Sequence, residues 1–390
     1  MNFELTEELL AVRDLSKKIA EEEVAGRARE IDRQARYPIE IFEVYRQTGL
    51  LGLCIPVEYG GAGMGTMGLT LAIEEVAKYS SAAALMLLLT RLASGPILIA
   101  GTESQKQKYL AGIANGSLKG SFALSEVQAG SDVKGILTNA KPVGADSSTW
   151  VINGRKCWIS GISQADFFVV FAKTLDKNDA TRASISCFIV DRDTDGLSIG
   201  SVDRKLGVKG VDTGELILDD VVVDQDAMLG EVGGFKLAML ALNSMRPIVA
   251  ARGIGLAEGC IAYAVDYMKT RRAFNRSISE FQGLRWEIAK LVTELEAARL
   301  LTYRAAFLID EGHFTKEYVP YLSMSKYYAT EMAVRASSLS LQVMGAAGYM
   351  EDHPLELYYR DAKQLTIVEG TSQIQLDLIA RGVFDGDISW

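Results

Sequence analysis

The sequence predicts an α+β protein in three parts: an N-terminal helical domain, a central antiparallel β domain and a C-terminal four-helix bundle. Two observations lead to this fold class. Apolar residues recur at helical spacing near both ends of the chain, whereas short runs rich in Val, Ile, Phe and Thr fill the middle. The 390 residues, 48% hydrophobic and 23% charged, are enough for two or three packed units with sizeable cores.

Residues 1–120 are predicted to form the N-terminal helical domain. The segments "ELLAVRDLSKKIAEEEVAG" and "LTLAIEEVAKYSSAAALMLLLTRLASGPILIAG" carry apolar residues at helical spacing. Thr6 is a suitable N-cap for the first helix, and Glu7 and Glu8 then lie favourably in its first turn.

Residues 121–232 are predicted to form the central β domain. Turn sequences such as "ING" and "DRDTDG" separate short β-type runs. The runs are "GSFALSE", "TWVINGRKCWISG", "ADFFVVFAKTL", "ASISCFIVD", "LSIGSV" and "GELILDDVVV".

Residues 233–390 are predicted to form the C-terminal bundle. In the segment that ends at Gly312, one apolar stripe runs from Leu284 to Leu308, and Gly312 is the expected C-cap. Several long helices with little proline are typical of a four-helix bundle.

Composition narrows the function. A net charge of −9 disfavours nucleic acid, because phosphate backbones are bound by basic patches. We expect no apolar run long enough to span a membrane, and no signal peptide or Arg-rich transit segment is recognised, so a cytoplasmic protein is expected. The four cysteines lack CxxC spacing and only two histidines exist, so we expect no metal site and no His-based triad. The chemistry must therefore rest on carboxylates or on a cofactor.

Glu369 is the strongest candidate for a catalytic residue. In "TIVEGTSQIQ" it follows an apolar run that we expect to be buried, and Gly370, Thr371 and Ser372 then start a final helix. A carboxylate in a dry pocket has a raised pKa. A base that removes a weakly acidic carbon-bound proton near neutral pH needs such a pKa. The alternative is a solvated glutamate at a helix end.

Other candidates carry open alternatives. The loop Ala129–Asp132 suits a phosphate, although such a loop is more often a plain turn. Trp158 is more often a core residue than a flavin-stacking one. Arg246 either meets a phosphate or is a solvated first-turn residue. Arg91 either snorkels to water, which we favour, or meets a polar substrate end in a cavity.

Taken together, the motifs resemble the acyl-CoA dehydrogenase family of flavoproteins over essentially the whole chain. The resemblance is carried by "PVEYGGAGMG", "LSEVQAGSDV", "WVINGRKCWISG", "LGVKGVDTGELILDDVVV", "NSMRPIVAARGIGLAEG", "RRAFNRSISEFQ", "QVMGAAGYM" and "RDAKQLTIVEGTSQIQ". It implies the acyl-CoA dehydrogenase fold, FAD as cofactor, an acyl-CoA substrate and a homotetramer built as a dimer of dimers.

The resemblance also implies a mechanism. Glu369 matches the catalytic base, which takes the α-proton of an acyl-CoA while a hydride leaves the β-carbon for the flavin. The product is a trans-2-enoyl-CoA. A ribityl hydroxyl of FAD and the backbone N–H of the base would form the oxyanion hole.

Further residues match cofactor and substrate positions of the family. Those that match FAD contacts are Phe122, Leu124, Ser125, Gly130, Ser131, Trp158, Ile159, Ser160, Thr371 and Gln373. Those that match residues holding the ADP half of FAD from a neighbouring subunit are Arg271, Phe274, Gln282, Gln342 and Gly345. Those assigned to substrate are Ser131, Asn243, Arg246 and Gly370, with Arg91 and Val368 as further candidates.

Departures from the family pattern bear on the substrate. Asn243 replaces an acidic residue and Val368 replaces an aromatic one, so CoA binding and acyl-pocket width are expected to differ. Met245 is not acidic, which leaves Glu369 as the base. We expect a short-to-medium acyl group, branched or polar-ended variants included, and electron-transfer flavoprotein as acceptor.

Two alternatives differ in class. The same fold could act as an enoyl-CoA reductase or an acyl-CoA oxidase, since direction depends on flavin potential and partner. A non-catalytic, nucleic-acid-associated flavoprotein would need a lost base or a basic extension. The presence of Glu369 and the charge of −9 disfavour this second alternative.

Overall fold

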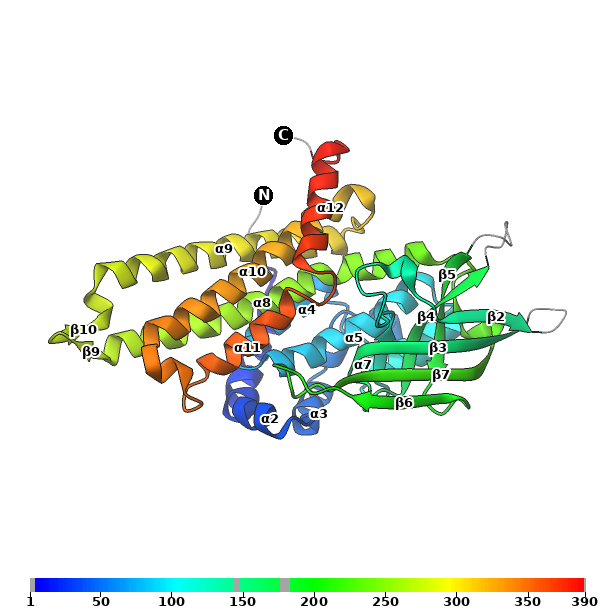
Figure 1. Cartoon of the computed structure of the whole chain (residues 1–390), viewed down its shortest axis with the longest axis horizontal. Coiled ribbons are helices and arrows are strands. Elements are labelled where there is room, and N and C mark those ends of the chain that lie inside the picture. Colours follow the sequence, from blue (N-terminus) through cyan, green and yellow to red (C-terminus); the bar gives the residue numbers. More distant parts are fainter. Residues whose placement is uncertain (1–3, 144–147, 176–182, 389–390) are drawn as a thin grey trace.

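The computed structural model describes residues 4–143, 148–175 and 183–388. Figure 1 shows an elongated molecule, with the β domain at one end of the long axis and long helices running to the other end. The element order is helices, strands, helices, as the sequence predicted.

The N-terminal helices form where the periodicity predicted them. Thr6 caps the first helix and accepts a hydrogen bond from the Leu9 N–H. The elements are α1 (Glu7–Ile19), α2 (Ala28–Gln34), α3 (Ile39–Gln47), α4 (Gly65–Ala77), α5 (Ser81–Ala100), α6 (Glu103–Gln105) and α7 (Ala111–Ala114).

One sheet makes up the β domain. Its strand order is β6-β7-β3-β2-β4-β5-β8, and β1 pairs with β4 in parallel, as β2 also does at one position. The strand pattern did not predict β2, β8 or these parallel pairings. The strands are β1 (Gly120–Ala123), β2 (Asn139–Val143), β3 (Thr149–Ser160), β4 (Phe167–Leu175), β5 (Ala183–Asp191), β6 (Leu197–Val202), β7 (Thr213–Asp224) and β8 (Met228–Leu229).

Long helices make up the C-terminal part. Helices α8, α9 and α10 pack along one another, α12 packs on α10, and the hairpin β9–β10 joins α8 to α9. Gly312 follows α9 with φ +77°, as expected of a C-cap. The elements are α8 (Phe235–Thr270), β9 (Arg272–Ala273), β10 (Arg276–Ser277), α9 (Gln282–Asp310), α10 (Val319–Met344), α11 (Leu355–Leu365) and α12 (Ser372–Phe384).

Helices α5 and α8 correct one expectation. Both are long and apolar enough to cross a membrane by length and composition, so the prediction that the chain has no such run was wrong. In each, 72% of the most apolar window is buried inside the fold. Because α4 and α5 pack directly on α8, the apolar character of α5 and α8 is explained by a shared protein core.

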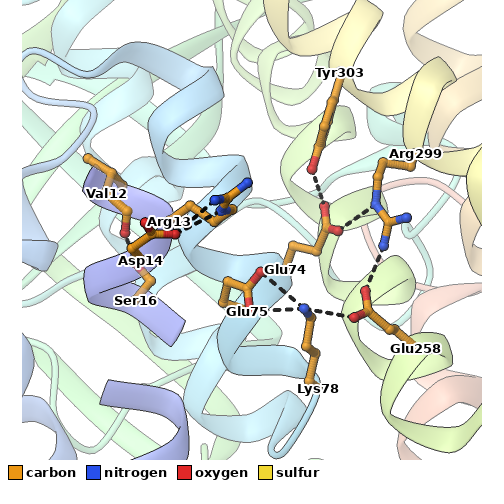
Figure 2. A network of polar contacts seen from close by, with 10 residues as sticks. All are labelled: Val12, Arg13, Asp14, Ser16, Glu74, Glu75, Lys78, Glu258, Arg299 and Tyr303. Atoms are coloured by element: carbon orange, nitrogen blue, oxygen red, sulfur yellow. Dashed lines mark hydrogen bonds and ion pairs between the residues drawn. The ribbon is translucent and has the colours of Figure 1, made fainter. Parts of the chain in front are cut away.

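A buried polar network joins α4 to α8 and α9 (Figure 2). We call it the helix-joining network. Arg299 donates to Glu74 at 2.8 Å and to Glu258 at 2.6 Å. Its other bonds run from Tyr303 to Glu74 and from Lys78 to Glu75 and Glu258, so every carboxylate oxygen of Glu74, Glu75 and Glu258 has a partner.

Candidate active site

Glu369 lies in a tight turn between α11 and α12. Both Glu369 and Gly370 have left-handed backbone conformations, with φ of 55° and 89°. A non-glycine residue in this conformation is uncommon and persists only where its surroundings enforce it. Thr371 then caps α12 by accepting a hydrogen bond from the Ile374 N–H at 3.3 Å. We call residues 366–371 the base turn.

Side chains from two helices enforce this conformation. Lys326 Nζ on α10 donates to the carbonyl of Gly370 at 2.8 Å. The amide nitrogen of Gln375 on α12 donates to the carbonyls of Glu369 and Gly370, each at 3.2 Å. A Cβ on Gly370 would lie 2.6 Å from that amide nitrogen, so a larger residue would displace the Gln375 amide as well as strain the backbone at its positive φ.

The carboxylate of Glu369 is incompletely paired. Its Oε2 is buried and has no hydrogen-bond partner among the described residues. Burial raises the pKa of Glu369 to about 7, although the charges of Lys326 and Arg252 pull it down. A carboxylate with this pKa and a free oxygen can accept a proton near neutral pH.

The apolar run before Glu369 is only partly buried. Leu365 and Thr366 are buried, but Ile367 is 56% exposed and Val368 is half-buried. The expectation that the whole run would be buried was therefore wrong. Because these residues belong to the end of α11 and a turn, successive side chains point in different directions.

Trp158 is not a core residue, although tryptophan at such a position is more often buried in a core. It is 54% exposed and has φ 58°. The register between β3 and β7 shifts between Lys156 and Ile159, and such a bulge re-aims a side chain out of the strand pattern. The large exposed ring fits a surface on which a planar cofactor such as a flavin can pack.

The structure brings the loop after β1 next to Trp158. The N–H of Cys157 donates to Ser125 O at 2.9 Å, and Ser121 Oγ donates to Ser160 O at 2.8 Å. Phe122, Leu124 and Ser125 therefore share one end of the sheet with Ile159 and Ser160. Gly130 and Ser131 are exposed farther along the same loop.

The Glu126–Lys156 pair, which the sequence did not predict, fixes this loop. Lys156 Nζ donates to Glu126 Oε1 at 2.8 Å and to Leu124 O at 3.0 Å. Burial alone would raise the pKa of Glu126, but Lys156 and the N–H groups of residues 137 and 138 lower it to about 2. Glu126 lies in the loop after β1 and Lys156 lies on β3, 30 positions away, so the sequence pattern offers no signal for this pair.

The β domain is tied to the helix that leads into the base turn. Val208 N–H, in the loop between β6 and β7, donates to Asp361 Oδ1 on α11 at 2.6 Å. The same loop accepts a hydrogen bond from Gly161 N–H, just beyond Trp158, at Asp212 O. A chain of contacts thus runs from the Trp158 strand to the base turn.

A second group of predicted cofactor residues lies elsewhere. The hairpin β9–β10 sits at the end of the long axis opposite the β domain (Figure 1). Phe274 and Asn275 form its tip with φ of 51° and 63°, and Phe274 is 90% exposed. The residues that belong to the hairpin or to nearby helix ends are Arg271, Phe274, Gln282, Gln342 and Gly345, all exposed.

The residues assigned to substrate are less accessible than expected. Arg246 is buried, and its Nη1 donates to Ser323 Oγ at 2.9 Å and to Val319 O at 3.2 Å, both on α10. Asn243 is also buried. The interpretation of Arg246 as a solvated first-turn residue is therefore wrong, and its described contacts join α8 to α10.

Arg91 is a further residue assigned to the substrate. It is half-buried on α5, and its Nε is buried without a hydrogen-bond partner among the described residues. A small cavity beside α5 is lined by Met86, Leu89 and Thr90, together with residues of α3 and β1. Neither Arg91 nor Glu369 lines it. Among the described residues, no group of His, Cys, Asp or Glu side chains could hold a metal ion.

Three family models match this chain in sequence order. They are the N-terminal domain of acyl-CoA dehydrogenase at residues 6–117, the middle domain at 121–221 and the C-terminal domain at 233–384. The chain belongs to the acyl-CoA dehydrogenase family. This confirms the predicted fold class and an FAD-dependent oxidoreductase that acts on an acyl-CoA.

Several individual proteins of known name are similar to this chain over almost its whole length. The chain is 42% identical to an acryloyl-CoA reductase (NADH) of Anaerotignum propionicum, over 98% of this chain and 96% of that protein. It is 39% identical to a rat short/branched chain specific acyl-CoA dehydrogenase, over 97% of this chain and 86% of that protein. Butyryl-CoA dehydrogenase of Megasphaera elsdenii superimposes with a TM-score of 0.93 at 34% identity, covering 98% and 100% of the two chains.

Proposed function

We propose that the protein interconverts a short-to-medium acyl-CoA and its trans-2-enoyl-CoA, with Glu369 as the base that removes the α-proton. The observation that carries this proposal is the state of the Glu369 carboxylate. Its Oε2 is buried and has no hydrogen-bond partner among the described residues. The residue itself is held in a left-handed backbone conformation. Bound FAD supplies the two-electron redox chemistry at the β-carbon.

The base turn has two tasks in this proposal. The carboxylate accepts the proton, and the backbone N–H of Glu369 donates to the thioester oxygen as negative charge builds up there. Lys326 and Gln375 keep both groups in place, so the site does not have to reorganise during proton transfer.

The cofactor would be held by chain segments from two ends of the molecule. We propose that Phe122, Leu124, Ser125, Gly130, Ser131, Ile159 and Ser160 border the flavin beside Trp158, with Thr371 and Gln373 on the other side. A second group lies at the end of the molecule that carries the β9–β10 hairpin. We propose that this group holds the ADP half of an FAD molecule that is bound to a neighbouring subunit. Its members are Arg271, Phe274, Gln282, Gln342 and Gly345. Ser131, Asn243, Arg246 and Gly370 are proposed for the CoA thioester, with Arg91 and Val368 near the acyl end.

Exposed apolar residues support a homotetramer. Trp286, Leu300 and Phe307 lie on α9 at successive spacings of fourteen and seven residues, and are 58%, 54% and 57% exposed. Residues at this spacing lie on one face of a helix. On α12, Phe384 is 88% exposed. We propose that these side chains are buried between subunits, which light scattering of wild type and Leu300→Glu would test.

The direction of the reaction has two candidates. The short/branched chain specific dehydrogenase favours oxidation of an acyl-CoA. The acryloyl-CoA reductase, and a 3-(aryl)acrylate reductase of Clostridium sporogenes at 38% identity, favour reduction of an enoyl thioester or acid. In that direction protonated Glu369 would deliver the proton to the α-carbon.

Electron-transfer flavoprotein is the proposed acceptor or donor. A structure described as the electron transferring flavoprotein of Acidaminococcus fermentans matches this chain with a TM-score of 0.93. We also propose a cytoplasmic location and the domain limits 1–120, 121–232 and 233–390.

One experiment tests base, substrate and direction together. The yellow protein is mixed anaerobically with saturated, branched and dicarboxylic acyl-CoAs, and the dithionite-reduced protein with the matching enoyl-CoAs, while flavin absorbance is followed. We expect bleaching by a short or medium acyl-CoA, its loss in Glu369→Gln, and its retention in Asp377→Asn, an exposed carboxylate on α12. Wild-type rates in Glu369→Gln would overturn the mechanism.

A further inference from the structure

Arg252 on α8 is a buried cation outside the residues assigned above. It is 1% exposed and among the largest fully buried side chains. Its Nη2 donates to the neutral side chain of Gln364, and its Nε is buried without a hydrogen-bond partner among the described residues. A buried charge that lacks full pairing is destabilising, so this arginine calls for a role besides packing.

The contact with Gln364 connects Arg252 to the base turn. The backbone carbonyl of Gln364 accepts hydrogen bonds from Ile367 N–H at 2.9 Å and Val368 N–H at 3.1 Å. These bonds form the first half of the turn that presents Glu369. Lys326 holds the second half through Gly370 O, so the base turn is held by two buried cations on two different helices.

The charge of Arg252 also acts on Glu369 directly. The two groups attract each other, which favours the ionised form of each. Each has a buried polar atom without a partner, Nε in Arg252 and Oε2 in Glu369. The remaining charged groups near this pair are Lys326 and Glu331 on α10, Arg246 on α8, Asp361 on α11 and Lys205 in the loop before β7.

We propose that Arg252 is a positioning residue for the reaction: it clamps Gln364 at the root of the base turn and holds a positive charge near Glu369. Ionisation of the carboxylate is then favoured, and the base turn is held in place, before substrate arrives. This inference rests on the proposed role of Glu369 as the base.

Lys326 alone does not provide this charge. Its ammonium is engaged by Gly370 O, and Glu331 as well as Glu369 attracts it. Burial also lowers the pKa of Lys326 to about 8, so its charge diminishes as the pH rises toward that value. The pKa of Arg252, although lowered by burial to about 10, leaves it charged throughout the range in which Glu369 titrates.

The test compares Arg252→Met, Arg252→Lys and Gln364→Met with wild type and with the control Arg335→Met, an exposed arginine on α10. The rate of α-proton exchange of an accepted acyl-CoA in deuterated buffer is followed by mass spectrometry from pH 5.5 to 9. This exchange reports on the base without an electron acceptor. Melting temperature and flavin content are measured on the same samples.

The exchange rate rises with pH as Glu369 ionises, and we call this rise the acid limb. We expect Arg252→Met to shift the acid limb to higher pH by about one unit, because the ionised form of Glu369 loses a stabilising positive charge. The rate would fall at every pH, because the clamp on Gln364 is lost as well, and it would fall about tenfold further at pH 6.5 than at pH 9. Arg252→Lys should keep the wild-type limb to within about half a unit, and Arg335→Met should change nothing. Gln364→Met keeps the charge and should lower the rate at every pH.

An equal loss at all pH values in Arg252→Met, or a limb that does not move, would show a purely structural role. If Arg252→Met does not accumulate as folded protein, the other two variants decide. The proposal then requires that Arg252→Lys keeps the wild-type acid limb of the exchange rate. It also requires that Gln364→Met lowers the exchange rate equally at all pH values. Absence of exchange in wild type with every acyl-CoA would instead overturn the proposed function.

Discussion

The molecule contains two buried ionic clusters that are built in opposite ways. In the helix-joining network, every carboxylate oxygen of Glu74, Glu75 and Glu258 has a partner (Figure 2). In the cluster around the base turn, Glu369 Oε2 and Arg252 Nε have none among the described residues. Both clusters join α8 to neighbouring helices.

The difference separates structure from chemistry. A fully paired network repays the desolvation of its charges with hydrogen bonds, and so it can hold helices together. An incompletely paired carboxylate is destabilising at rest but keeps an oxygen free for a proton. Complete pairing is thus typical of a scaffold, and incomplete pairing at an enforced turn is typical of a reactive site.

The largest effect is expected from Glu369→Gln, which should lower turnover of an accepted acyl-CoA by about 10²–10⁴-fold, because a positioned base contributes a factor of that size. Stopped-flow flavin absorbance measures this loss. A variant that keeps more than a tenth of the wild-type rate would contradict the comparison.

The next largest effect is expected from Arg299→Met in the helix-joining network. Glu74 and Glu258 would be left without their arginine, and breaking such a buried pair costs about 3–5 kcal/mol. Urea unfolding followed by circular dichroism measures the free energy. Molecules that remain folded should keep wild-type turnover per flavin, and a large loss of turnover would erase the distinction between the clusters.

A smaller effect is a stability gain in Glu369→Gln that depends on pH. The pKa of Glu369 is raised from 4.5 to about 7 in the fold, so the folded state binds the proton more tightly than the unfolded chain. Ionisation therefore destabilises the fold progressively from pH 4.5 to 7. The variant should gain on the order of 1–3 kcal/mol at pH 8 and nothing at pH 4, as seen in melting temperatures at both values.

The smallest effect is expected from Lys78→Met at the more exposed edge of the helix-joining network. The Lys78 side chain is 20% exposed and Glu258 31%, so solvent screens part of the attraction. A loss of about 1 kcal/mol is expected. A loss as large as that of Arg299→Met would mean that the whole network is equally shielded.

The sequence predicted the order of helices and strands, because apolar periodicity records which face of each element is buried. Thr6 and Gly312 marked helix ends correctly through their capping chemistry. Strands β2 and β8 were missed, because five- and two-residue strands carry too little pattern.

The site was predicted less completely, because its geometry depends on distant contacts. The bulge that exposes Trp158 arises from pairing with β7, and the burial of Arg246 arises from α10. Glu126–Lys156 and Arg252–Gln364 join residues 30 and 112 positions apart. One sequence without an alignment offers no signal for such pairs. The assignments of individual site residues stay predictions.

Helix α8 has a consequence for how the chain folds. Its 36 residues pack against α4 and α5, which precede the β domain in the sequence, and against α9 and α10, which follow it. The N-terminal segment matched by its family model is therefore a unit of sequence but not of folding, because α4 and α5 lack their main partner until α8 has been made. We expect slow, late acquisition of native structure during synthesis, and a fragment ending at residue 232 should be a target for chaperones and proteases.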